Sequence, residues 1–369
     1  MDNANRISIR SFTIIVIFVT VGTSILIAPS GLAAAAQQDA WLAGIIGSGV
    51  NILLVVLYAA IGDRYPDLNL AQYTDKLLGR WIGAAVTLSY TAYFFLLGSL
   101  MIGSMGFFMT TQLLQDTPVE ALMLLFSLVV VIALKSGSTV YSRAVEIFFP
   151  WTVALLAMLL LCLIPVLEPS RLLPVYEFGA KPILRGAYAF YSLQNSVLLM
   201  MLYPYVSPGK GRRRALIGGT LAGNVVLVLL TLLCVMMLGP EQTGNNVYPT
   251  YLLAKNVSFG GFLERMEGVL IFIWILSIFI RVLIAFHATI GCVAHVLRIR
   301  DENILVWPIM LAGIVVALMC YSNMVIVQES IAKSWSTMSL LPLVLLPLLL
   351  YFVSLARGKL ALQDQPASR

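Results

Sequence analysis

The stretch Thr20–Gly31 combines small polar residues with helix breakers in the middle of a long apolar run. The apolar run extends from Phe12 to Ala36. Gly22, Thr23 and Ser24 lie at the centre of this run, and Pro29 follows in its second half. Because glycine and proline both disfavour a helix, we expect the helix to break here. The unpaired N–H groups of a second half-helix that begins near Ser24 would attract a carboxylate. The alternative is a kinked helix whose hydroxyl groups bond back to their own turn.

A second polar centre lies at Ser192–Ser196 in a later apolar run. Its Gln194, Asn195 and Ser196 interrupt that run at mid-membrane, where lipid cannot satisfy freed peptide groups. Such breaks persist where they line a polar cavity, and transporter binding sites are commonly built from them. Carbonyl and amide groups at this break could bind an ammonium group. The two breaks together predict a site for a zwitterionic amino acid.

Tyr90, Tyr93 and Leu97 stand three and four residues apart, so they share one face of a helix. We expect this face to contribute to the same site. The alternative for the two tyrosines is packing, with each hydroxyl bonded to a neighbouring helix.

Arg281 is a charged residue inside an apolar run. It lies 17 residues after Glu264 and 17 residues before Arg298, which places it near the midplane. A charge at that depth is costly and is usually functional or paired. Arg281 could bind the carboxylate of a ligand. Alternatively, carbonyl groups freed at the break in Thr20–Gly31 satisfy its charge, and it has no ligand role.

The elements that must position these residues are membrane-spanning helices. The chain has 369 residues, of which 60% are hydrophobic and 11% charged, whereas a soluble domain carries about 25% charged residues. Its apolar runs reach the roughly 20 residues that a bilayer requires, so we predict an all-α polytopic membrane protein with about ten transmembrane helices. The predicted spans are about 12–36, 41–61, 81–112, 119–135, 144–165, 183–204, 215–238, 262–297, 304–321 and 336–356.

The basic residues predict the topology. Sixteen of the 23 Lys and Arg residues fall on the side of the two termini, six fall on the other side, and Arg281 remains in the membrane. The positive-inside rule therefore places both termini and the loop 204–214 in the cytoplasm, and 239–261 outside. Residues 357–369 should form a cytoplasmic tail without regular structure. The basic charges do not cluster with a nucleic-acid-binding motif, so we expect no nucleic-acid partner.

The order of the spans repeats within a single integral membrane domain. Repeat one covers about 12–165 and repeat two about 183–356, and each begins with an interrupted span. Five spans is an odd number, so the second repeat is inverted relative to the first. Interrupted segments at corresponding places of two inverted repeats indicate a transporter-type binding site.

Two charged clusters lie outside the predicted site. Glu264, Arg265 and Glu267 open the eighth span, where they could form a gate or contact a partner. The alternative is that the acidic residues only complement the helix dipole. Lys210–Arg214 determines topology, and attraction to anionic membrane lipid is a second role for it.

The sequence gives no indication of an enzyme. It shows no nucleophile triad, phosphate-binding loop or cluster of metal ligands, and its four cysteines lack metal-ligand spacing. We therefore expect neither catalysis nor a metal or other cofactor.

The first break carries a family resemblance. Its pattern Gly22-Thr23-Ser24-Ile25-Leu26…Pro29 resembles the amino acid–polyamine–organocation transporters, which have the five-plus-five leucine-transporter fold with helices one and six broken. The chain also resembles a narrower group over about 10–356. The features that carry this resemblance are the ten spans, Tyr203-Pro204 and Glu264-Arg265-Met266-Glu267. That group is the permease (B) subunits of bacterial spore germinant receptors.

The resemblance implies a function. Such a subunit would bind a small germinant, such as an amino acid, at mid-membrane and trigger germination with partner subunits. The implied partners are a larger membrane (A) subunit and a lipid-anchored (C) subunit, a lipoprotein, all in the inner membrane of the bacterial endospore. In sodium-coupled relatives of this fold the eighth span helps form a cation site, so Arg281 could act there as a tethered cation. An autonomous amino-acid transporter of the same fold and a non-binding membrane scaffold are the alternatives.

Overall fold

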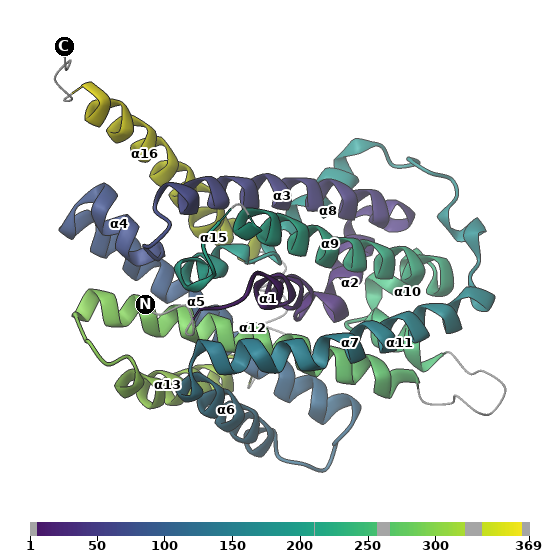
Figure 1. The fold of residues 1–369 in the computed structure, drawn as a ribbon. Helices are drawn as coiled ribbons and strands as arrows, with labels where there is room; N and C mark the ends of the chain where they lie inside the picture. The colour runs from purple at the N-terminus through teal and green to yellow at the C-terminus, as the bar shows by residue number, and fades with distance from the viewer. Residues whose placement is uncertain (1–5, 210, 257–265, 322–333, 364–369) are drawn as a thin grey trace.

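The computed structural model describes residues 6–209, 211–256, 266–321 and 334–363. These residues form a helical bundle, with α1 near its middle (Figure 1). The α-helices are α1 (Ile9–Val21), α2 (Ser24–Ala36), α3 (Ala40–Arg64), α4 (Leu70–Leu78), α5 (Arg80–Gln112), α6 (Val119–Ser136), α7 (Ser138–Leu163), α8 (Ala180–Ser192), α9 (Gly211–Leu238), α10 (Pro240–Asn245), α11 (Pro249–Lys255), α12 (Met266–Leu297), α13 (Asn303–Tyr321), α15 (Ser336–Leu340) and α16 (Leu346–Gln363). Short turns are η2 (Gln37–Asp39), η3 (Ile164–Val166), η4 (Pro169–Leu172), η5 (Ser196–Met201), η6 (Tyr203–Tyr205) and η8 (Leu341–Leu345).

Eight helical stretches in the described ranges are long and apolar enough to cross a membrane. One of them, Ser24–Arg64, contains both α2 and α3. With α1 and α2 counted as one broken span, and α8 and η5 as another, the described elements supply the ten predicted spans. The protein is therefore a multi-pass integral membrane protein.

The two broken spans differ in construction. In the first, α1 ends at Val21, Gly22 has a φ of 29°, and α2 begins at Ser24. In the other, α8 ends at Ser192, and the chain continues after Asn195 as the 3-10 turn η5. Both predicted breaks are present, but the second half of span six is a 3-10 turn and not an α-helix.

Three segments differ from the sequence prediction. The predicted polar loop 62–80 contains α4, whose N-terminus is closed by a capping box of Asn69 and Gln72. The predicted loop 239–261 contains α10 and α11, each begun by a proline. Helix α16 continues to Gln363, so the tail prediction was wrong for residues 357–363. Helix α4 has a capped N-terminus, α10 and α11 begin with a proline, and apolar residues of α4 and α11 are buried in the bundle.

Burial separates the helices into an interior and a periphery. In α12, 72% of the most apolar window is buried, whereas in α7 only 17% is buried. Helix α12 packs on α5 and α1, and α1 packs on α9. The core therefore lies around α1 and α12, so a charged residue midway along α12 lies inside protein.

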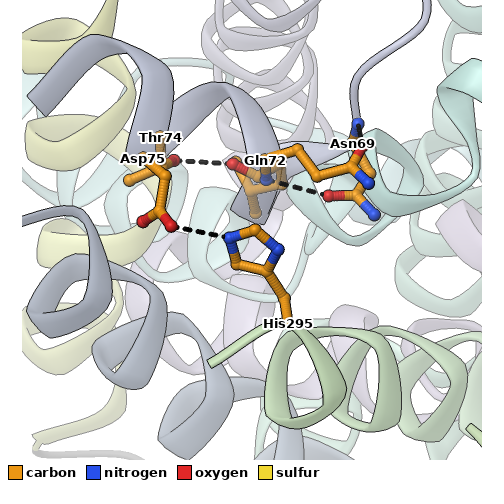
Figure 2. A network of polar contacts seen from close by, with 6 residues as sticks. Asn69, Gln72, Thr74, Asp75 and His295 are labelled. Carbon is orange, nitrogen blue, oxygen red and sulfur yellow. Dashed lines mark hydrogen bonds and ion pairs between the residues drawn. The ribbon is translucent and has the colours of Figure 1, made fainter. Parts of the chain in front are cut away.

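One end of the bundle gathers the N-terminus, α4 and the C-terminal ends of α12 and α16. The Ile7 amide donates to the Tyr205 carbonyl at 2.9 Å. Figure 2 shows His295 of α12 paired with Asp75 of α4, at 2.8 Å between Nε2 and Oδ2. Arg357 of α16 donates to the Lys76 carbonyl at 3.1 Å. This is the end that the positive-inside rule predicts to be cytoplasmic.

Candidate functional site

Arg281 joins the two broken spans. Its side chain is 1% exposed, Nη1 donates to Ser24 Oγ at 3.2 Å, and Nη2 donates to the Leu193 carbonyl oxygen. The carbonyl that meets the guanidinium thus comes from the break in span six, and the first break supplies a hydroxyl. The alternative in which carbonyls of the first break satisfy Arg281 is not what the structure shows.

The position of the Arg281 side chain over the first break requires a glycine at position 22. A Cβ atom built on Gly22 would lie 2.3 Å from Arg281 Cδ and 2.9 Å from Nη1. Its positive φ is also a backbone conformation that glycine adopts most easily. The small residue therefore lets the Arg281 side chain pass directly over the break.

A cavity of about 80 Å³ lies beside Arg281. Five predicted site residues line it: Thr23, Ser24, Leu97, Asn195 and Arg281. Typical pockets for small organic ligands measure about 300–1,000 Å³. The cavity is therefore smaller than such a pocket, and it would have to widen to enclose a whole amino acid.

Tyr93 fixes Asn195 at the cavity wall. Its hydroxyl donates to Asn195 Oδ1 and lies 3.3 Å from Ser339 Oγ. The Tyr93 ring stacks on Trp335 with centroids 5.6 Å apart, and Trp335 Nε1 donates to the Ser192 carbonyl at 3.2 Å. Span three and span ten therefore hold the broken end of α8 together.

The structure does not place every predicted residue at the cavity. Tyr90 is fully buried and stacks on Phe94 with centroids 5.6 Å apart. Its hydroxyl has no hydrogen-bond partner among the described residues, whereas the packing alternative predicted a bond to a neighbouring helix. Gln194 and Ser196 are buried beside Asn195, and their side-chain polar atoms have no hydrogen-bond partner among the described residues. None of these three lines the cavity, and their ligand roles stay predictions.

Sequence reasoning missed several wall residues. Leu100, Met101 and Ser104 continue the helical face of Leu97, at three, four and seven residues beyond it. That spacing could have found them. Tyr321 ends α13 and Trp335 directly precedes α15, and no local pattern marks either residue.

The charge of the cavity is positive. Its lining contains one guanidinium and no carboxylate, and Arg281 forms no ion pair in the part of the chain that is described. A guanidinium has five N–H donors, and two of its nitrogens have the acceptors described above. The remaining donors suit a carboxylate. The described residues contain no group of three potential metal ligands.

A second cavity, of about 460 Å³, lies at the end that is predicted to be outside. Phe107, Thr111 and Tyr248 are among its lining residues. Burial raises the pKa of Tyr248 above its usual value. The Phe107 ring lies 6.4 Å from that of Tyr321, which lines the first cavity. This aromatic pair therefore stands between the two cavities.

The predicted gate is described only in part. Glu264 and Arg265 lie outside the described residues. Glu267 lies in the first turn of α12, where an acidic side chain complements the helix dipole. Its role as a gate or partner contact stays a prediction.

A family model described as "Spore germination protein" matches residues 6–351. The chain belongs to the family of spore germination proteins. Spore germination protein KB of Bacillus subtilis is 24% identical over 96% of each chain. Spore germination protein YndE of the same organism is 24% identical over 80% of this chain and 82% of its own.

Solved structures show the fold of this spore germination family member. Mhp1, a nucleobase-cation-symport-1 family transporter in a closed conformation, superposes with a TM-score of 0.61 at 12% identity. The match covers 87% of this chain and 73% of Mhp1. A mutant of the Eremococcus coleocola manganese transporter superposes with a TM-score of 0.57 at 11% identity, and the match covers 89% of this chain and 75% of the transporter. The predicted leucine-transporter-like fold is confirmed.

Proposed function

We propose that this chain is the permease-like subunit of a spore germinant receptor and binds a small germinant, such as an amino acid, at mid-membrane. The observation that carries the proposal is the cavity at which Arg281 of α12 bonds to both broken spans. Neither break alone would form a site, because the guanidinium reaches Ser24 and Leu193 from a third helix.

The chemistry of the cavity matches a zwitterion. Donors of Arg281 and N–H groups at the start of α2 would bind the carboxylate. The Leu193 carbonyl has a second lone pair for an ammonium group. Asn195 Oδ1 lies at the same wall, held by Tyr93. The ligand would therefore bridge the breaks, as Arg281 does in this structure.

Binding changes the bonds between the breaks. A ligand carboxylate competes with Ser24 and Leu193 for the guanidinium, so α2 and α8 become free to shift relative to α12. Such a shift is a two-state change that a ligand with differential affinity can drive. The outer cavity and the Phe107–Tyr321 pair provide the entry route from outside.

The response would pass to partners. We propose a membrane A subunit and a lipoprotein C subunit in the inner membrane of the endospore, because relatives over nearly the whole chain are spore germination proteins. Membrane lipid surrounds the apolar helices, and nucleic acid has no role. Ligand sensing requires no catalysis.

Germination assays test the proposal. Spores that lack this chain are complemented with wild type, Asn195→Ala or Asn224→Ala, and germination is followed against each of the common amino acids. Asn195 lines the cavity, whereas Asn224 is equally buried in α9 and does not. We expect Asn195→Ala alone to shift the dose–response curve. Equal responses from the two variants at matched membrane levels would contradict a site in this cavity.

An autonomous amino-acid transporter is the second candidate, because the solved neighbours over most of the chain are transporters. Uptake of labelled amino acid into proteoliposomes that contain only this chain would support it. A response that requires the partner subunits, with no uptake, supports the receptor. Assembly without any effect of cavity variants would support a scaffold.

A further inference from the structure

A third cavity, of about 600 Å³, lies at the predicted cytoplasmic end and shares no lining residue with the central cavity. It lies between the end of α3 and the N-terminus of α9. Its lining residues are Asp63, Pro66, Pro208, Gly209, Arg212, Arg213, Arg214 and Ile217. The lining therefore contains three arginines and one acidic residue.

Arg212 forms the buried wall of this cavity. It is 3% exposed, and its Nη atoms donate to the Pro66 carbonyl at 2.9 Å and the Val206 carbonyl at 2.7 Å. Its guanidinium also lies over the Tyr203 ring, 4.9 Å from the centroid. Its Nε is buried and has no partner among the described residues. Arg212 thus brings a fixed positive charge that no hydrogen-bonded carboxylate neutralises.

The local acids leave an excess of positive charge. The Asp63 carboxylate already accepts a hydrogen bond from the Tyr203 hydroxyl at 2.6 Å. Asp63 and Asp67 also attract the charge of Arg212, and Arg6 repels it. In the described part of the chain none of Arg212, Arg213 and Arg214 forms an ion pair. Their charges add to the positive end of the α9 dipole.

We propose that this basic cavity binds a phosphate group, carried by an anionic phospholipid headgroup or by a soluble phosphate. Guanidinium groups bind phosphate through paired N–H donors. The N–H groups at the start of a long helix favour the same anion.

The surface next to the cavity favours the lipid source. Arg214, Gly218, Leu221 and Val225 recur at helical spacing, so they share one face of α9. Leu221 and Val225 are 49% and 56% exposed, as expected of a face that contacts acyl chains. A lipid on this face would place its phosphate beside Arg214.

Binding of defined probes to the purified full chain in detergent tests the site. The probes are phosphatidylglycerol, diacylglycerol with the same acyl chains, glycerol 3-phosphate and inorganic phosphate. The variant Arg213→Gln/Arg214→Gln removes two exposed charges and retains Arg212, which holds the surrounding backbone. The matched control is Arg80→Gln/Arg300→Gln, which removes two exposed charges outside the cavity. Unfolding of both variants is measured alongside.

We expect phosphatidylglycerol to bind more tightly than diacylglycerol, and the Arg213/Arg214 variant to weaken it about 30-fold, from the contribution of each basic residue at an anionic surface. The control pair should bind as wild type does. If neither glycerol 3-phosphate nor inorganic phosphate displaces bound phosphatidylglycerol, the source of the phosphate is the lipid. If either of them displaces it, the source is a soluble phosphate. The proposal would be overturned if diacylglycerol bound as tightly as phosphatidylglycerol. It would also be overturned if the Arg213→Gln/Arg214→Gln variant and the control variant bound phosphatidylglycerol equally well.

Discussion

Gly22→Ala should destabilise the protein and abolish the germinant response. The new Cβ would lie 2.3 Å from Arg281 Cδ, and φ at this position is +29°. Placing a side chain on a backbone with a φ of 29° and a ψ of −128°, a sparsely populated region, costs roughly 1–3 kcal/mol. Loss of one hydrogen bond from the displaced guanidinium adds about 1.5–3 kcal/mol. The expected loss in the free energy of unfolding is therefore about 2.5–6 kcal/mol.

Gly31→Ala is the matched control. Gly31 lies within the same broken span, in α2, and a Cβ there meets nothing within 4 Å. Alanine in place of glycine inside a helix stabilises by roughly 0.5–1 kcal/mol. Chemical unfolding of the purified chain in lipid–detergent micelles measures both variants, and germination of complemented spores measures the response.

A double-mutant cycle separates the clash from other effects. If Gly22→Ala acts by displacing Arg281, then Arg281→Met should cost about 1.5–3 kcal/mol less in the Gly22→Ala background than alone. Additive losses would refute the contact as the cause. A Gly22→Ala protein that unfolds and responds like Gly31→Ala would refute the reasoning altogether.

Three further predictions concern the site charge, the topology and the cytoplasmic end. Arg281→Lys should raise the germinant concentration for half-maximal response about tenfold or more, with rescue by excess germinant, because lysine lacks the planar fork. Arg281→Met should not respond. Dose–response curves with and without sodium at matched membrane levels measure both variants, and a normal response from Arg281→Met would exclude the residue from the site. Single cysteines in the loops 204–214 and 239–261 should be labelled from opposite sides, and labelling of both from one side would contradict the ten-span topology. His295→Gln should lower the free energy of unfolding by at most about 1 kcal/mol, because its pair with Asp75 is partly exposed; a larger loss by chemical unfolding would show that the pair holds α4 in place.

Local backbone chemistry made the breaks predictable. Gly22 cannot sit well inside a helix, and the second half-helix, predicted to begin near Ser24, begins there as α2. The depth of Arg281 also followed from its position between charged residues at the ends of its run. The helices of the polar segment 62–80 were missed, because an apolar-run criterion does not detect the short amphipathic α4.

The sequence by itself determined the class, the spans, the two breaks and the buried charge, because bilayer length, helix propensity and the cost of an intramembrane charge act along the chain. Only the tertiary structure decided which groups meet. Arg281 reaches Ser24 across 257 positions and Leu193 across 88, and Tyr93 reaches Asn195 across 102. Such pairs depend on how helices pack and rotate against each other, and no local pattern encodes that rotation. For the same reason Trp335 was found at the cavity wall only in the folded chain.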